Sequence, residues 1–198
     1  MHQCVYVLID PNTNNIERAV VRALAPFDEN LSVPPYKVYL SHAATVEMAS
    51  CHRLDPNDLP ALAPLIEDWI GGEGGIDDTG LFSKRTTNPH GEWDWYEIGG
   101  RWDGYLHGRT AAPSDEVPGT AENNSVLAAS LLKNRELASR LPAAILTPTG
   151  QWIEKSPFIT TMSGWFIAEH TKAEWLAFTR RILTAFPKHI VVCVDVHF

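Results

Sequence analysis

The chain ends in Ile190-Val-Val-Cys-Val-Asp-Val-His-Phe198, a stretch whose side chains alternate between two characters. One set is entirely apolar: Ile190, Val192, Val194, Val196 and Phe198. The intervening set is mixed: Val191, Cys193, Asp195 and His197. Successive side chains of a β-strand point to opposite faces, so this alternation predicts a strand with one core face and one partly polar face.

The N-terminal stretch sorts in the same way. One side carries Gln3, Val5, Val7 and Ile9, and the other carries His2, Cys4, Tyr6, Leu8 and Asp10. The matching patterns predict that the terminal strands are neighbours in one sheet, with their valines buried beneath helices that include residues 172–186. Their polar sides would then merge into one surface holding Cys4, Tyr6, Cys193, Asp195 and His197.

Other segments complete the expected fold. Thr171-Lys-Ala-Glu174 matches a capping box that opens the helix ending near residue 186. A strand over 163–168 before it would make a crossover unit with the last strand, and leucine spacing predicts another helix over 124–141. These patterns favour an α+β fold: a ferredoxin-like antiparallel or mixed sheet with helices on one face. We expect one domain, 1–198, with an inserted segment at roughly 26–120.

That insertion carries Trp93-Asp-Trp-Tyr-Glu-Ile-Gly-Gly-Arg-Trp102, which holds three of the seven tryptophans. A Gly-Gly pair between aromatic, β-favouring runs is typical of a tight hairpin turning at Gly99-Gly100. In that register Trp95 and Trp102 share one face, and Tyr96 and Arg101 share the other. The tryptophans either build a core or line a pocket.

Composition narrows the function classes. The chain has 198 residues and a formal net charge of -8, which opposes non-specific binding to nucleic acid or anionic membrane. No apolar run is long enough for a membrane span, and the N-terminus lacks a signal-peptide pattern. Three cysteines without disulfide or zinc spacing favour a reducing cytoplasm. We expect neither a metal nor a cofactor.

Two groups of residues are candidates for a site. If the protein is an enzyme, Asp195 would orient His197 as a general base. Otherwise this side of the sheet is exposed to solvent or covered by the inserted segment. A ligand-binding pocket would use aromatic rings and one arginine: Trp95, Tyr96, Arg101, Trp102 and Tyr6. The alternatives are that the tryptophans are ordinary core and that Arg101 pairs with a nearby aspartate.

The motif Asn88-Pro, three residues, then Trp93 to Trp102 resembles a family of uncharacterised bacteriophage and prophage proteins. The similarity extends to residues 25–30, 147–152, 164–166 and 194–197, and so spans most of the chain. The family supplies no established activity to carry over. What the resemblance implies is a setting: a small accessory protein in the cytoplasm of a host cell, acting against host defence.

Three functions follow as hypotheses. The first is a phage protein that binds a small anionic, nucleotide-like ligand and serves as a sponge for a host immune messenger. The second is a hydrolase or phosphodiesterase that uses His197 and Asp195. The third is an interaction module whose partner is a host protein, and self-association is left open.

Overall fold

The computed structural model describes residues 1–111, 119–134, 140–156, 158–161, 164–167 and 169–197. The chain divides into two compact units, one formed by residues 1–29 and 90–198 and the other by residues 30–89. The second unit lies within the segment expected as an insertion, residues 26–120. The tryptophan-rich segment was expected in that insertion as well, but it belongs to the first unit.

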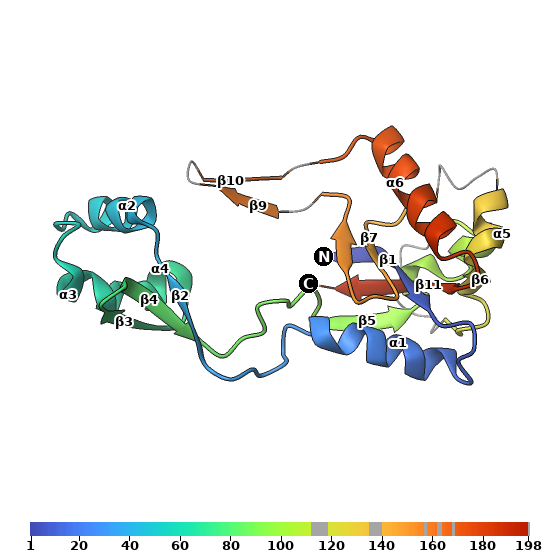
Figure 1. Ribbon diagram of the computed structural model, residues 1–198, viewed down its shortest axis with the longest axis horizontal. Helices are drawn as coiled ribbons and strands as arrows, with labels where there is room; N and C mark the ends of the chain where they lie inside the picture. The colour runs from blue at the N-terminus through green and yellow to red at the C-terminus, as the bar shows by residue number, and fades with distance from the viewer. Residues whose placement is uncertain (112–118, 135–139, 157, 162–163, 168, 198) are drawn as a thin grey trace. The chain divides into compact units, whose positions relative to one another are not determined.

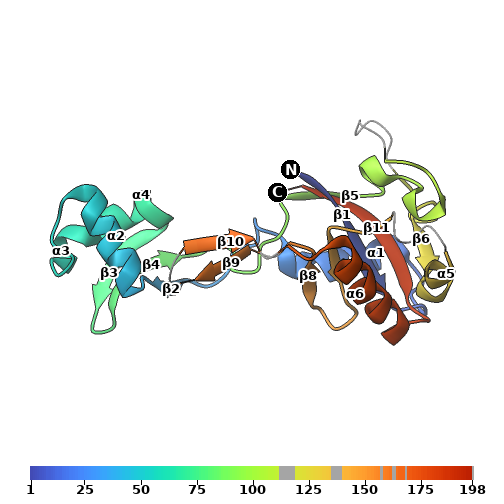
Figure 2. The same cartoon turned by 90° about the horizontal axis from the view of Figure 1, so that it is seen from above.

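The first unit is built on a mixed six-stranded sheet whose strand order is β5-β11-β1-β7-β8, with β6 also pairing with β11 (Figure 1). Its strands are β1 (His2–Ile9), β5 (Trp95–Ile98), β6 (Ser125–Leu127), β7 (Ala144–Leu146), β8 (Trp152–Glu154) and β11 (Ile190–His197). The terminal strands β1 and β11 pair along their whole length, antiparallel, from His2 opposite His197 to Ile9 opposite Ile190. Their predicted adjacency is confirmed, and Figure 2 also shows the two ends of the chain side by side.

Helices cover both faces of this sheet. The valines on the apolar face of β1 and β11 (Val5, Val7, Val192, Val194 and Val196) are buried, as predicted, but against α1 (Ile16–Leu24), which contributes Val20 and Leu24. The opposite face packs against α5 (Ala128–Lys133) and α6 (Lys172–Ala185), which contribute Leu131, Trp175 and Leu183. The expectation that helix 172–186 covers the valines is therefore wrong. Figure 1 shows α1 and α6 on opposite sides of the strands.

The fold is α+β with a mixed sheet, but the finer ferredoxin-like expectation is not confirmed. Helices lie on two faces instead of one, and β7 runs parallel to β1 as its direct neighbour. The crossover over 163–198 is also absent from the described strands, because β10 (Gly164–Ile167) pairs with β9 (Phe158–Thr161) in a separate hairpin. Residues 163, 168 and 198 of the expected strands lie outside the described residues.

The tryptophan-rich segment does not form the predicted hairpin at Gly99-Gly100. Its strand β5 pairs antiparallel with β11, and the chain then leaves the sheet. Gly99 and Gly100 have φ of +78° and +50°, and they lead into a 3-10 turn, η3 (Gly100–Trp102), followed by η4 (Tyr105–His107). The two glycines supply the positive φ that a hairpin needs, but they use it to turn the chain away from the sheet.

Residues 124–141, expected as one helix, contain β6 and then α5, and residues 135–139 lie outside the described part of the chain. A 3-10 turn, η1 (Ala25–Phe27), follows α1. Within the residues that the structure describes, we find no helix with both the length and the apolar character needed to cross a membrane.

The second unit is a three-stranded antiparallel sheet in the order β2-β4-β3, packed against short helices. Its strands are β2 (Tyr36–Tyr39), β3 (Glu73–Asp77) and β4 (Gly80–Arg85). Its helical segments are α2 (His42–His52), α3 (Leu59–Leu62), η2 (Ala63–Leu65) and α4 (Ile66–Ile70). Met48, Leu62, Ile66 and Leu81 form its core. The unit therefore has a hydrophobic core of its own.

Candidate functional site

Two histidine–aspartate pairs lie where β1 begins and β11 ends. Register places His197 opposite both His2 on β1 and Trp95 on β5. Residues opposed across strands share a face, so these three rings lie together. Asp94 immediately precedes β5, and its backbone N–H donates to the carbonyl of His197 at 2.9 Å. We call His2, Asp94, Asp195 and His197 the His–Asp cluster.

The outer pair is His197 with Asp94. Nδ1 of His197 lies 2.8 Å from Oδ1 of Asp94, and the two side chains are 39% and 34% exposed. The hydrogen bond from His197 is the largest of the causes that lower the pKa of Asp94. Asp94 is therefore a carboxylate at neutral pH, and it fixes the orientation of an imidazole that solvent can reach.

The inner pair is His2 with Asp195. Nδ1 of His2 lies 3.0 Å from Oδ1 of Asp195, whose side chain is fully buried. The second carboxylate oxygen accepts the backbone N–H of Arg101 at 3.1 Å. A buried carboxylate is costly unless it is hydrogen-bonded, and both oxygens of Asp195 are. The inner pair therefore ties the start of β1 and η3 to β11.

The two imidazoles lie close together beside an exposed indole. Their ring centroids are 5.1 Å apart, and the Trp95 ring stands edge-on to His2 at 5.9 Å. Trp95 is 44% exposed. Because each imidazole uses Nδ1 for its aspartate, each Nε2 faces away from its own carboxylate. The cluster thus offers two oriented imidazoles and one accessible aromatic ring.

The rest of the expected polar surface is buried. Sγ of Cys4 and Sγ of Cys193 are 3.3 Å apart, and burial is the main cause that raises the pKa of Cys4 well above its ordinary value. The Tyr6 hydroxyl donates to the carbonyl of Arg140, and burial also raises the pKa of Tyr6. Cys4 and Tyr6 are therefore protonated and shielded at neutral pH. Over the described part of the chain, no group of three or more His, Cys, Asp or Glu is placed to hold a metal.

The sequence-predicted site residues are only partly brought together. Asp195, His197 and Trp95 lie at the cluster, and Arg101 joins it through its backbone N–H. The remaining aromatic residues lie elsewhere: Tyr6 is in the core under α6, Tyr96 packs on Trp93 on the valine face, and Trp102 packs against the α6-side core. The expected aromatic pocket of five residues is therefore not assembled.

The predicted pairing of Asp195 with His197 is also wrong. Asp195 contacts His2, and Asp94 takes the role expected of Asp195. Sequence reasoning missed His2 and Asp94. His2 sits on the polar side of its strand, which was a usable signal. Asp94 could be found only by knowing that β5 pairs with β11.

A separate carboxylate has a perturbed pKa. Burial, and then the charge of Glu154, raise the pKa of Glu92 from 4.5 to about 7. Such an acid binds its proton more tightly in the folded than in the unfolded chain. Its destabilising effect is absent below pH 4.5, grows as the pH rises, and is complete above about 7.

Glu92→Gln should therefore stabilise the protein at pH 8 and have little effect at pH 4. The pKa difference corresponds to about 3 kcal/mol at most, and because Glu92 is only partly buried we expect about 1–2 kcal/mol. Urea unfolding at both pH values measures this. Exposed Glu29→Gln is the control, and a Glu92→Gln gain that does not depend on pH would contradict the assignment.

Comparison of the chain with protein-family models, with curated proteins and with solved structures finds no match.

Proposed function

We propose that the protein is a hydrolase that cleaves a phosphodiester bond in a small, anionic, nucleotide-like substrate, with His197 transferring the proton. The observation that carries this proposal is the pair of imidazoles 5.1 Å apart, each hydrogen-bonded through Nδ1 to a different aspartate. A carboxylate that holds Nδ1 fixes the ring and stabilises the positive charge that develops when Nε2 takes a proton.

The chemistry needs few groups. Nε2 of His197 takes a proton from a water molecule as its oxygen bonds to phosphorus. The bond from phosphorus to the leaving oxygen breaks, and that oxygen takes a proton from the imidazolium or from solvent. Asp94 compensates the charge on His197 throughout. The His2 ring lies near enough to His197 for both to contact one phosphate group.

The surroundings support the substrate class. An exposed indole such as Trp95 can stack on a nucleobase. The net charge of -8 disfavours long polyanions, which leaves small nucleotides. The resemblance to phage proteins extends the proposal to a setting, the host cytoplasm, and to a substrate that is a host immune messenger.

A second candidate function is binding without turnover. It is favoured by the exposed Trp95, which can hold a base whether or not the phosphate is cleaved. In that case the protein is a sponge that removes a nucleotide signal from solution.

Incubation with a nucleotide panel tests both functions. The panel contains cyclic mononucleotides, cyclic dinucleotides and linear dinucleotides, and the protein carries no residual tag, because His2 and His197 are opposed at the chain ends. After heating and removal of the protein, chromatography of the supernatant should show a cleaved diester. Recovery of intact ligand that had co-purified with the protein supports the sponge instead. If no ligand is bound or altered, both candidates fail and a protein partner is favoured.

A further inference from the structure

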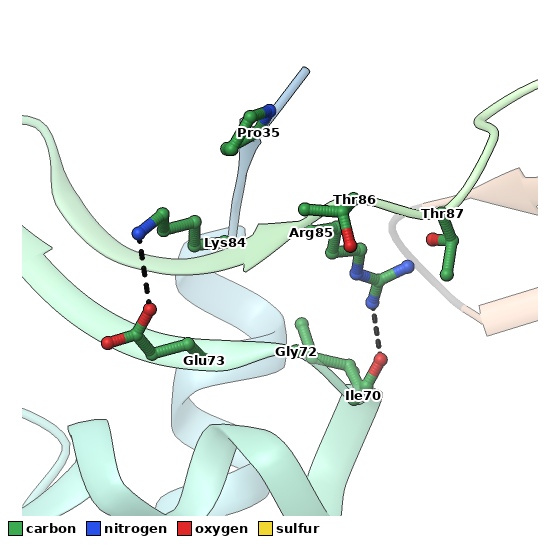
Figure 3. A pocket seen from close by; sticks show the side chains of 9 residues that line it. Pro35, Ile70, Gly72, Glu73, Lys84, Arg85, Thr86 and Thr87 are labelled. Carbon is green, nitrogen blue, oxygen red and sulfur yellow. Dashed lines mark hydrogen bonds and ion pairs between the residues drawn. The ribbon is translucent and has the colours of Figure 1, made fainter. Parts of the chain in front are cut away.

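The second unit contains a pocket where β4 ends, with a volume of about 630 Å³ (Figure 3). It is formed within residues 30–89, whereas the His–Asp cluster belongs to the first unit. We call it the β4-end pocket. Its lining consists of Pro35, Ile70, Gly71, Gly72, Glu73, Lys84, Arg85, Thr86 and Thr87. Pockets of roughly 300–1,000 Å³ are the usual size for small-molecule sites.

The pocket holds an arginine whose guanidinium is fixed in place. Nη2 of Arg85 donates to the carbonyl of Ile70, and Nε donates to Oγ of Ser83 at 3.2 Å. Nη1 makes no hydrogen bond to the described residues, and Figure 3 shows this end of the guanidinium extending toward Thr87. An arginine held in this way loses little side-chain entropy when its remaining donors bind an anion.

Two glycines keep this arrangement tight. Gly72 has a φ of +81°, and a Cβ there would lie 2.4 Å from Oγ of Ser83 and 2.7 Å from the carbonyl oxygen of Lys84. Ser83 in turn donates to the carbonyl of Gly71 while it accepts from Arg85. A side chain at position 72 would therefore displace the hydroxyl that orients the guanidinium.

The remaining lining is suited to an anion. Lys84 makes one ion pair, with Glu73 at 3.3 Å, and both side chains are largely exposed, at 49% and 76%. The Lys84 ammonium lies with Glu73 on the sheet face away from α4, whereas the next residue, Arg85, turns its guanidinium toward α4, because successive side chains of a strand alternate. The exposed hydroxyls of Thr86 and Thr87 make no hydrogen bond to any described residue. The pocket thus offers an anion one fixed guanidinium and two hydroxyls in a protein of net charge -8.

A purely structural role for Arg85 explains only part of the pocket's arrangement. Arg85 satisfies the carbonyl at the C-terminal end of α4, and that contact uses Nη2 alone. It accounts neither for the cavity nor for the two threonine hydroxyls that line it.

We propose that the β4-end pocket binds the phosphate of a small phosphorylated molecule of mononucleotide size. The phosphate meets Nη1 of Arg85 and a threonine hydroxyl, and the organic body lies against Pro35 and Ile70. Such charge-assisted contacts to a phosphate are the strong ones in water. The site is separate from the His–Asp cluster and does not depend on the function proposed there.

The test uses the full chain, with adenosine monophosphate, inorganic phosphate and uncharged adenosine as probes. Amide shifts on titration should move at Gly72 and Thr86 with the two phosphates and stay fixed with adenosine. Arg85→Gln should weaken adenosine monophosphate binding about tenfold or more. The matched control is Lys37→Gln, a lysine on β2 that pairs with Asp77, and it should leave the affinity unchanged.

Arg85→Lys serves as the second variant, because it keeps a donor for Ile70 while losing the fixed fork. It should also weaken binding, and unchanged unfolding in urea would show that the unit is intact. His197→Ala should not alter these shifts, so failure here and failure of the hydrolase proposal are distinguishable. Three outcomes would overturn the proposal: equal binding of adenosine and its monophosphate, no shift at residues 71–73 and 84–87 with millimolar phosphate, or full affinity in Arg85→Gln.

Discussion

Gly100→Val should be among the most destabilising single substitutions in the first unit. Gly100 is buried with a φ of +50°, and a Cβ there would lie 2.6 Å from both Cβ and Oδ2 of Asp195. A β-branched residue is disfavoured at positive φ and would push aside the carboxylate that joins β11, His2 and η3. We expect a loss of about 3 kcal/mol or more and a melting temperature lower by about 6–12 °C.

Thermal unfolding followed by circular dichroism measures the effect. Two further variants separate its two causes, the backbone strain and the contact with Asp195. Gly150 has a φ of +77° but no atom within 4 Å of an added Cβ, so Gly150→Ala carries backbone strain alone. Gly100→Ala carries the strain and the contact with Asp195. The excess loss in Gly100→Ala over Gly150→Ala is then the cost of that contact, and equal losses would show that Asp195 moves freely.

The pairing of the terminal strands was predictable because both faces of each strand carry information. Five apolar residues stand at alternate positions of 190–198, so the strand face that carries them must be buried. The sequence of β1 shows the same alternation. Which helix covers a face is not encoded in that pattern. Both α1 and α6 are amphipathic, so sequence alone could not assign the valines to one of them.

The mixed face was harder to interpret than the apolar one. Cys4, Tyr6 and Asp195 suit a wet surface, but they suit equally a buried face whose polar atoms have partners. Here those partners come from distant residues: the Arg140 carbonyl for Tyr6, and His2 with the Arg101 N–H for Asp195. Burial was decided by the packing of α5 and α6 over this face, and the local sequence pattern that predicts a helix does not show which face of the sheet it covers.

The Gly-Gly pair failed as a predictor for a related reason. Positive φ at two successive glycines is required for a hairpin, and it also lets a chain leave a sheet edge. Whether a hairpin forms depends on whether β5 pairs with the residues that follow it or with another strand. The long strand β11 was such a neighbour, and this pairing brought Asp94 to His197 across 103 positions of sequence.

His197→Ala should abolish turnover of the phosphodiester identified with the nucleotide panel. Removing a general acid–base group costs about 10²–10⁴-fold in rate, and His197 is the exposed, carboxylate-bound imidazole of the cluster. Asp94→Asn should retain the ring but lose the charge that compensates it, so a smaller loss of at least about tenfold is expected. Initial rates across a range of substrate concentrations separate kcat from KM.

The matched control is His42→Ala, an exposed histidine at the start of α2 in the second unit, and its rates should equal those of the parent. If His197→Ala binds the same nucleotide only more weakly and the parent never cleaves it, the protein is a sponge. A parent that cleaves the diester while His197→Ala retains full kcat removes His197 from the chemistry. His2 then becomes the remaining imidazole to test, since its carboxylate partner, Asp195, is bound independently of Asp94.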